Sequence, residues 1–220
     1  MFAMKPMLIL LLCASMAAGM ARAGNYTWNN TGSNWFSDAN WDGDAGYPGN
    51  GDTATMNAGT LVLTNETGYL ASFTMGGGTL PFTNWNTKLS AMSITLTAGT
   101  VTHGDNSDTN GADGWTADAR VWMACSNLSV GSSAFINVKG KGYRGGTNQN
   151  DFGCGPGAAS AALTGAAHGG YGGNNPTSLY GVASTPAQPG SGGAGNWAGQ
   201  PLADGGGGVK IDADLDVLGG

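Results

Sequence analysis

The densest group of potential metal ligands is an acidic loop in the middle of the chain. It runs from Asp105 to Asp113 and also offers oxygen atoms from Asp108 and Asn110. Carboxylate and amide oxygens are the ligands that Ca²⁺ prefers. The loop is therefore the candidate calcium site, although it lacks the glutamate that closes a calcium-binding loop. The alternative is a solvated excursion of the chain without a metal.

A second segment, Asp38 to Gly43, opens like a calcium loop, with oxygen ligands at alternate positions and a glycine for the tight turn. Its closing position is occupied by Gly49 instead of a glutamate. No apolar helical pattern flanks it on either side. We interpret this segment as a structural turn.

Catalytic residue types are scarce in this chain. The histidines are His103 and His168, and Glu66 is the single glutamate. No motif brings a nucleophile, a base and an orienting group together. Paired aspartates can cleave polysaccharides as acid and base, but the candidates share the acidic loop instead of recurring on successive strands. The sequence thus predicts no catalytic residue, no enzyme, and no cofactor except calcium in that loop.

Aromatic and sulfur-containing side chains offer two further possibilities. Trp85, Trp115 and Trp122 are candidates for stacking on sugar rings, because an indole face is apolar and polarizable. The alternative is that these rings are buried as packing. Cys125 and Cys154 can form a disulfide outside the cytosol or remain as two thiols, and sequence alone leaves both possibilities open.

The N-terminus predicts export. Lys5 precedes an apolar run from Met7 to Met16, and Ala21 to Ala23 fits a small-residue cleavage site. Such a run is too short to span a bilayer. We expect a signal peptide over residues 1–23, a secreted or cell-surface protein, and no membrane insertion by this chain. The net charge of −6 disfavours nucleic acid and anionic lipid as partners.

The elements that would position these residues are strands. Three similar segments lie about twenty residues apart, and their glycines are separated by 19 and 21 residues. The segments are Thr55–Leu61, Thr74–Leu80 and Thr95–Val101. Alternate residues in each are apolar, which predicts strands with one buried face. Copies at a fixed period can stack as the rungs of a β-solenoid; an antiparallel sandwich is the alternative.

Composition divides the chain further. Residues 24–51 hold Trp28, Trp35 and Trp41, which we expect to be buried as a cap on the first rung. Residues 52–138 form the predicted rungs. Residues 139–208 are glycine-rich and predict either a linker or an ordered insertion. Residues 209–220 resume the strand pattern as the start of a further rung.

The motif Trp-x-x-x-Gly-x-x-Trp-x-x-x-x-Asn-Trp, then Pro-Gly-x-Gly-Asp-Thr-Ala and strands beginning Gly-Thr, resembles large bacterial surface proteins with autotransporter-associated β-strand repeats. The residues that carry it are Trp28, Gly32, Trp35, Asn40, Trp41, Pro48, Gly49, Gly51, Asp52, Thr53 and Ala54. The likeness covers residues 24–138. It implies a right-handed parallel β-helix, displayed or secreted, with a structural or adhesive role. The chain is shorter than such proteins and stops in mid-repeat, which predicts a fragment.

The expectation from the sequence is an all-β, non-enzymatic surface protein: a right-handed parallel β-helix with a Trp-rich cap and a glycine-rich insertion. Its expected partners are glycans or other surface proteins. The alternative is a β-helical polysaccharide-degrading enzyme or its carbohydrate-binding module. Acidic residues stacked on one face beside a groove would favour that alternative.

Overall fold

The computed structural model describes residues 23–112, 114–148, 150–168, 171–173, 179–181, 188–195 and 204–213. The predicted signal peptide lies outside this range except for Ala23. So do Asp113 of the acidic loop and residues 214–220 of the last predicted rung.

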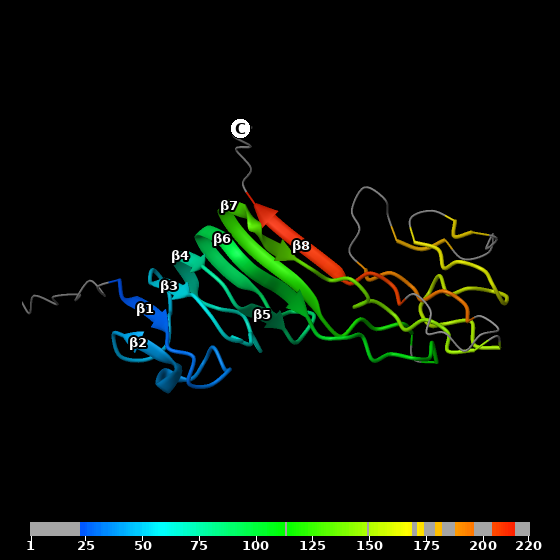
Figure 1. Ribbon diagram of the computed structural model, residues 1–220, viewed down its shortest axis with the longest axis horizontal. Coiled ribbons are helices and arrows are strands. Elements are labelled where there is room, and N and C mark those ends of the chain that lie inside the picture. Colours follow the sequence, from blue (N-terminus) through cyan, green and yellow to red (C-terminus); the bar gives the residue numbers. More distant parts are fainter. Residues whose placement is uncertain are drawn as a thin grey trace, which may run out of the picture.

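The described chain is a mostly-β protein built on one eight-stranded sheet (Figure 1). The strands are β1 (Asn25–Trp28), β2 (Trp41–Gly43), β3 (Thr53–Met56), β4 (Tyr69–Met75), β5 (Thr79–Phe82), β6 (Leu89–His103), β7 (Arg120–Ile136) and β8 (Gly208–Ala213). One 3-10 turn, η1 (Asp38–Asn40), precedes β2. The described residues contain no α-helix. The all-β prediction is confirmed.

The sheet is mixed but largely parallel. Its order is β2-β1-β3-β4-β6-β7-β8, and β5 also pairs with β6. Only β1 and β2 pair antiparallel; the remaining named strands pair parallel. Figure 1 shows β3, β4, β6, β7 and β8 side by side, with the loops of the glycine-rich segment at the end farthest from β1 and β2. The described strands therefore do not form an antiparallel sandwich.

The similar segments seen in the sequence lie in register. Thr55 pairs with Thr74, and Thr74 pairs with Thr95. Each segment then turns at a glycine with positive φ, at 73°, 88° and 96° for Gly59, Gly78 and Gly99. A Cβ on Gly78 would lie 2.5 Å from the Gly59 carbonyl oxygen, closer than real Cβ atoms come. Glycine is required here because it adopts positive φ and lets backbone approach backbone.

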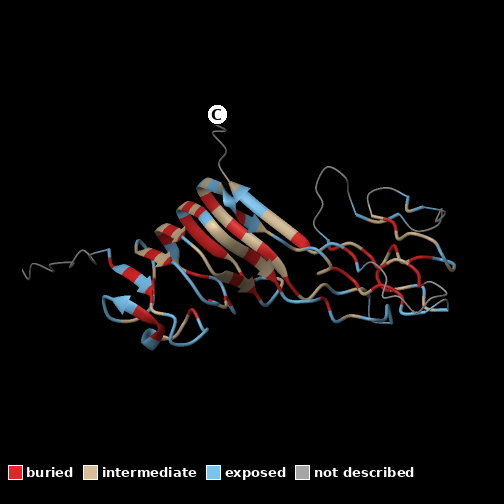
Figure 2. Ribbon diagram, viewed as in Figure 1, coloured by how far each residue is buried: buried red, intermediate tan, exposed pale blue. Residues whose placement is uncertain are grey.

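Buried side chains form ladders on the inner side of these parallel strands. Met56, Met75 and Leu96 occupy paired positions, as do Ala54, Phe73 and Ile94. All six are at most 1% exposed. Figure 2 shows this alternation as buried bands along the strands. The alternation matches the period of two expected for strands with one buried face.

The N-terminal tryptophans are buried, as predicted. Trp28, Trp35 and Trp41 are 5%, 0% and 5% exposed. Their rings meet edge to face, with centroids 5.7 Å apart for Trp28–Trp41 and 4.9 Å for Trp35–Trp41. The Trp35 ring also contacts Phe73 of β4 at 5.7 Å. We call Trp28, Trp35 and Trp41 the indole core; it is continuous with the hydrophobic core of the sheet.

The described parts of the segment between β7 and β8 are joined by backbone hydrogen bonds. Tyr143 N donates to Gly190 O at 2.9 Å, and Gly190 N donates to Gly206 O at 2.7 Å. Gly192 lies so close to the Arg144 carbonyl that a Cβ there would overlap it. Small residues thus permit these backbone segments to approach one another closely.

Candidate functional site

A group of tryptophan and basic side chains gathers at one end of strands β6, β7 and β8. It consists of Trp85, Lys88, Arg120, Trp122 and Lys210, which we call the aromatic–cationic cluster. Arg120 opens β7, and its guanidinium carbon lies 4.5 Å from the ring centroids of both Trp85 and Trp122. Its Nε also donates to the Trp85 carbonyl oxygen at 2.9 Å. The guanidinium is therefore held between two indoles by cation–π contacts.

The parallel register places the two lysines beside Trp122. Lys88 immediately precedes Leu89, which pairs with Met123, and Trp122 pairs with Lys210 of β8. The Lys88 and Lys210 ammonium groups lie 5.0 and 4.0 Å from the Trp122 ring centroid. Neighbouring strands thus carry a lysine, a tryptophan and a second lysine in one row, perpendicular to the strands.

Two carboxylates border this row. Glu66 forms an ion pair with Lys88 at 2.6 Å, and Asp212 pairs with Lys210 at 2.9 Å. The Trp122 indole Nε1 donates to Asp212 at 2.8 Å. Hydrogen bonds from Lys210 and then Trp122 hold the pKa of Asp212 below its usual range. The cluster therefore combines three cations with two charged carboxylates.

Sequence reasoning selected Trp85 and Trp122 as candidates for sugar stacking but missed the cations around them. Lys88 lies 32 residues before Arg120, and Lys210 lies 90 residues after it, so no local motif links them. In the structure, cationic side chains contact the faces of the Trp85 and Trp122 rings. The third candidate, Trp115, lies outside the cluster and packs edge to face on Tyr143, with centroids 5.4 Å apart.

The acidic loop uses its oxygens on the protein itself. Asp105 forms an ion pair with Lys141 at 2.6 Å. Asp108 accepts from the backbone N–H groups of Thr116 and Asn110, and the Asn110 side chain accepts from that of Ala112. Within the described part of the chain no three acidic, histidine or cysteine side chains form a metal-binding group. With Asp113 outside that part, calcium binding stays a prediction.

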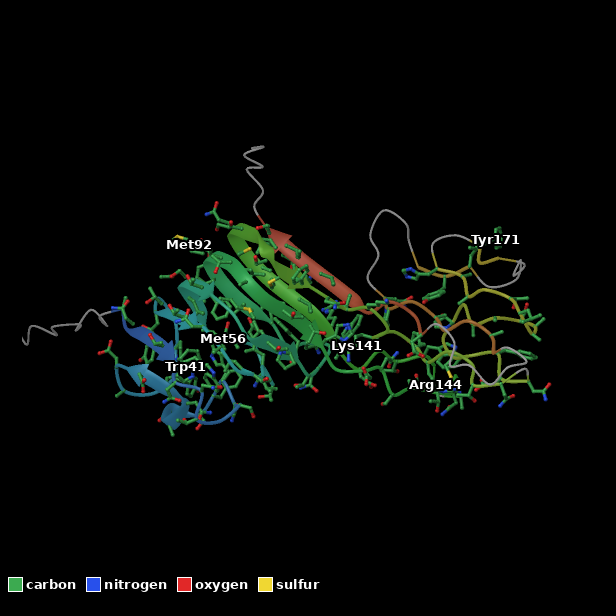
Figure 3. The ribbon with its side chains drawn as sticks, viewed as in Figure 1. Trp41, Met56, Met92, Lys141, Arg144 and Tyr171 are labelled. Atoms are coloured by element: carbon green, nitrogen blue, oxygen red, sulfur yellow. The ribbon has the colours of Figure 1, made fainter. Side chains whose placement is uncertain are left out.

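The two cysteines are free thiols in the structure, and both are buried. Cys125 lies in β7, where burial raises the pKa of its thiol. Cys154 lies in the glycine-rich segment, 3.6 Å from Nη2 of Arg144. Figure 3 shows Arg144 among the loops beyond the strands, with Lys141 nearer to the sheet. Of the two alternatives, a disulfide or two separate thiols, the structure contains the two thiols.

His103 is a buried residue at the end of β6. It pairs with Phe82 across β5 and β6 and is 1% exposed. Burial lowers the pKa of its imidazole. Its Nδ1 lies 2.6 Å from the Gly104 carbonyl oxygen, and its Nε2 has no hydrogen-bond partner among the described residues. A neutral histidine in this position contributes packing.

Comparisons with known proteins add no relative. No family model, no curated protein and no solved structure matches this chain. Across the residues that the structure describes, no helix has the length and apolar character needed to cross a bilayer. The site must be judged on its own geometry.

Proposed function

We propose that this chain is a secreted, non-enzymatic surface protein with a structural or adhesive role, folded as a right-handed parallel β-helix. The observation that carries the proposal is the regular parallel stacking. The same positions pair at steps of 19 and 21 residues, with a glycine turn at each step. Repeats that contact only their neighbours form extended faces, and such faces suit binding to polymers or other surfaces.

The resemblance to autotransporter-associated β-strand repeats belongs to the same proposal. Its motif residues form hydrogen bonds within the N-terminal region. Buried Asn40 donates to Asn34 O at 2.8 Å, and Trp41 donates to Trp35 O at 2.7 Å. Asp52 accepts from the Gly24 and Gly49 backbone N–H groups, each at 2.7 Å. These contacts support the interpretation of the motif as a folded cap and assign no residue to chemistry.

The β-helical part of the proposal is tested by removing one repeat. Deletion of residues 60–78 joins Gly59 to Thr79 and removes one full step. A stacked array tolerates this because each repeat contacts only its neighbours. The shortened chain should keep its strand signal in circular dichroism and unfold cooperatively, at a lower temperature. Deletion of residues 60–69, half a step, should abolish folding. An equal loss of strand signal and of cooperative unfolding in both deletion variants would contradict the stacked-repeat proposal.

The adhesive role is tested by a glycan array combined with an assay for released reducing sugar. The expected result is binding to at least one surface polysaccharide without release of sugar. Release that disappears in Asp108→Ala would overturn the proposal in favour of a polysaccharide-degrading enzyme. The protein contacts of the Asp108 and Asp105 carboxylates already argue against that alternative.

A further inference from the structure

We infer that the aromatic–cationic cluster binds the charged groups of an acidic polysaccharide. This inference rests on the proposed role at a surface and names the class of partner. The carboxylates or sulfates of such a polymer would bind Arg120 and the flanking lysines, which the two indoles hold in place. Four observations support it: the presentation of Arg120, the gathering of cations, the row across three strands, and the coverage of the indoles.

Arg120 is held in a fixed orientation with unused donors. Two indoles flank its guanidinium, and the Trp85 carbonyl accepts from Nε. Among the described residues no hydrogen-bond partner is present for Nη1 or Nη2. The guanidinium is partly desolvated, and its pKa is lowered by burial. A planar fork with free donors suits a carboxylate or sulfate, which accepts two parallel hydrogen bonds.

The gathering of cations is unusual for this composition. The whole chain has eight basic residues and fourteen acidic ones, and two of the basic ones lie in the predicted signal peptide. Lys88, Arg120 and Lys210, three of the remaining six, surround one indole. Glu66 and Asp212 pair with the lysines, and Arg120, which Asp212 influences only at a distance, has no ion pair among the residues that the structure describes. An anionic group is therefore attracted to this point of an otherwise acidic surface.

The row geometry favours a polymer over a single small anion. Lys88, Trp122 and Lys210 lie at successive strand positions. Strands in a sheet are about 4.8 Å apart, so the backbone positions of the two lysines lie roughly 10 Å apart along the row, and both ammonium groups reach toward the Trp122 ring between them. An extended acidic chain laid across the strands can place successive charged groups beside both lysines and Arg120 at once.

The coverage of the indoles disfavours a neutral sugar. Trp122 is contacted by three cations, and Trp85 stacks on Arg120. A neutral ring would compete with these cations for the indole surface. A negatively charged sugar instead adds ionic hydrogen bonds to the same cations. The cluster therefore distinguishes acidic from neutral polysaccharides.

The test is equilibrium binding of the purified full chain to three immobilised polysaccharides: polygalacturonate, dextran sulfate and neutral dextran. The first two separate carboxylate from sulfate as the recognised group. Arg120→Gln should weaken binding to the preferred acidic polymer about tenfold or more, since one charge-assisted fork is lost. Arg120→Lys keeps the charge but removes the fork and should be intermediate. Lys210→Gln should weaken binding about threefold.

Two further variants sharpen the result. Lys139→Gln removes an equal charge from an exposed lysine outside the cluster and should change affinity less than twofold. Asp212→Asn removes a negative charge beside Lys210 while keeping an acceptor for Trp122, and should strengthen binding. Raising salt from about 50 to 200 mM should weaken it, because exposed charges are screened. Circular dichroism establishes that each variant is folded.

The inference is overturned if folded Arg120→Gln and Lys210→Gln bind the acidic polymers as the unmodified chain does, or if neutral dextran or double-stranded DNA binds as tightly. Either result leaves the proposed adhesive role intact when binding on the glycan array persists. The adhesive role itself fails if the chain binds none of the arrayed glycans or releases sugar from one. The two failures are thus distinguishable.

Discussion

The indole core and the aromatic–cationic cluster use tryptophan in opposite ways. In the indole core, rings contact other rings and all three are nearly inaccessible to solvent. In the cluster, Trp85 and Trp122 are half-buried, and their rings contact arginine and lysine. Figure 3 shows Trp41 of the indole core beside β1 and β2, far from the strand ends where β8 begins. The neighbouring side chains, not the residue type, determine whether a tryptophan is packed in the core or holds cationic side chains at the surface.

This difference has an energetic consequence. A fully buried indole removes a large apolar area from water, and its loss leaves a cavity. A half-buried indole in contact with lysines contributes less to folding, because exposed cation–π contacts are weak. The comparison therefore predicts large effects on stability at the indole core, and effects on binding at the cluster.

Trp35→Ala should have the largest effect on stability. Trp35 is 0% exposed and contacts both Trp41 and Phe73. Its removal should lower the free energy of unfolding by about 3–5 kcal/mol. The measurement is urea unfolding followed by tryptophan fluorescence and circular dichroism. Trp35→Phe, which keeps a ring, should lose clearly less. A loss below about 1 kcal/mol in Trp35→Ala would show that the indole core does not support the sheet.

Asn40→Ala should have the next largest effect. Its buried side chain donates to the Asn34 carbonyl oxygen and holds the turn between Trp35 and Trp41. Asn34 O keeps its hydrogen bond from Ser37 N, so the loss is that of one part-buried hydrogen bond, about 0.5–1.5 kcal/mol of unfolding free energy. Asn84→Ala is the matched control, because exposed Asn84 makes a similar bond to the Thr64 carbonyl at 3.0 Å. The control should change stability by less than about 0.5 kcal/mol.

Trp122→Ala should reverse the pattern seen for Trp35→Ala. We expect a loss of less than about 1 kcal/mol in unfolding free energy, because the ring is half-buried. Polysaccharide affinity should nevertheless fall several-fold, since Lys88, Arg120 and Lys210 lose their common support. Urea unfolding and the binding assay on the same sample measure both. Destabilisation as large as that of Trp35→Ala would remove the distinction between the two regions.

The sequence predicted the indole core better than the cluster, for a physical reason. Trp28, Trp35 and Trp41 lie within one short segment, so their spacing already indicated a shared packing role. The cluster depends on long-range register. The step from β6 to β7 is enlarged by the acidic loop, and β8 follows only after residues 137–207. No local pattern indicates that Lys210 will pair with Trp122.

The acidic loop illustrates a second limit. Its aspartates and asparagine were predicted as calcium ligands because their oxygens recur at short intervals. In the described residues those oxygens accept backbone N–H groups or meet Lys141. Asx turns and metal ligation require the same residue types. Which of them forms depends on where the neighbouring backbone lies, and this is not encoded in the spacing.

The smallest expected effect is a pH dependence at the cluster. The lowered pKa of Asp212 means that folding favours its carboxylate form, through Lys210 and Trp122. This contribution to stability is present above the pKa of an unfolded aspartate, about 3.9, and is lost as pH falls through the lower folded value. Asp212→Asn lacks it at every pH. Unmodified protein should therefore melt slightly higher than Asp212→Asn at about pH 6, and the gap should shrink as the pH falls below about 4.

The control for this last measurement is Asp38→Asn, at an exposed aspartate whose side chain makes no hydrogen bond among the described residues. It removes the same charge outside the cluster, so it separates the loss of the Asp212 contacts from the change in net charge. A gap for Asp212→Asn that stays constant down to pH 2 would mean that the charge of Asp212 does not contribute to stability. The cluster would then resemble the indole core. A gap that closes at low pH would show that the Asp212 carboxylate stabilises the cluster through its charge.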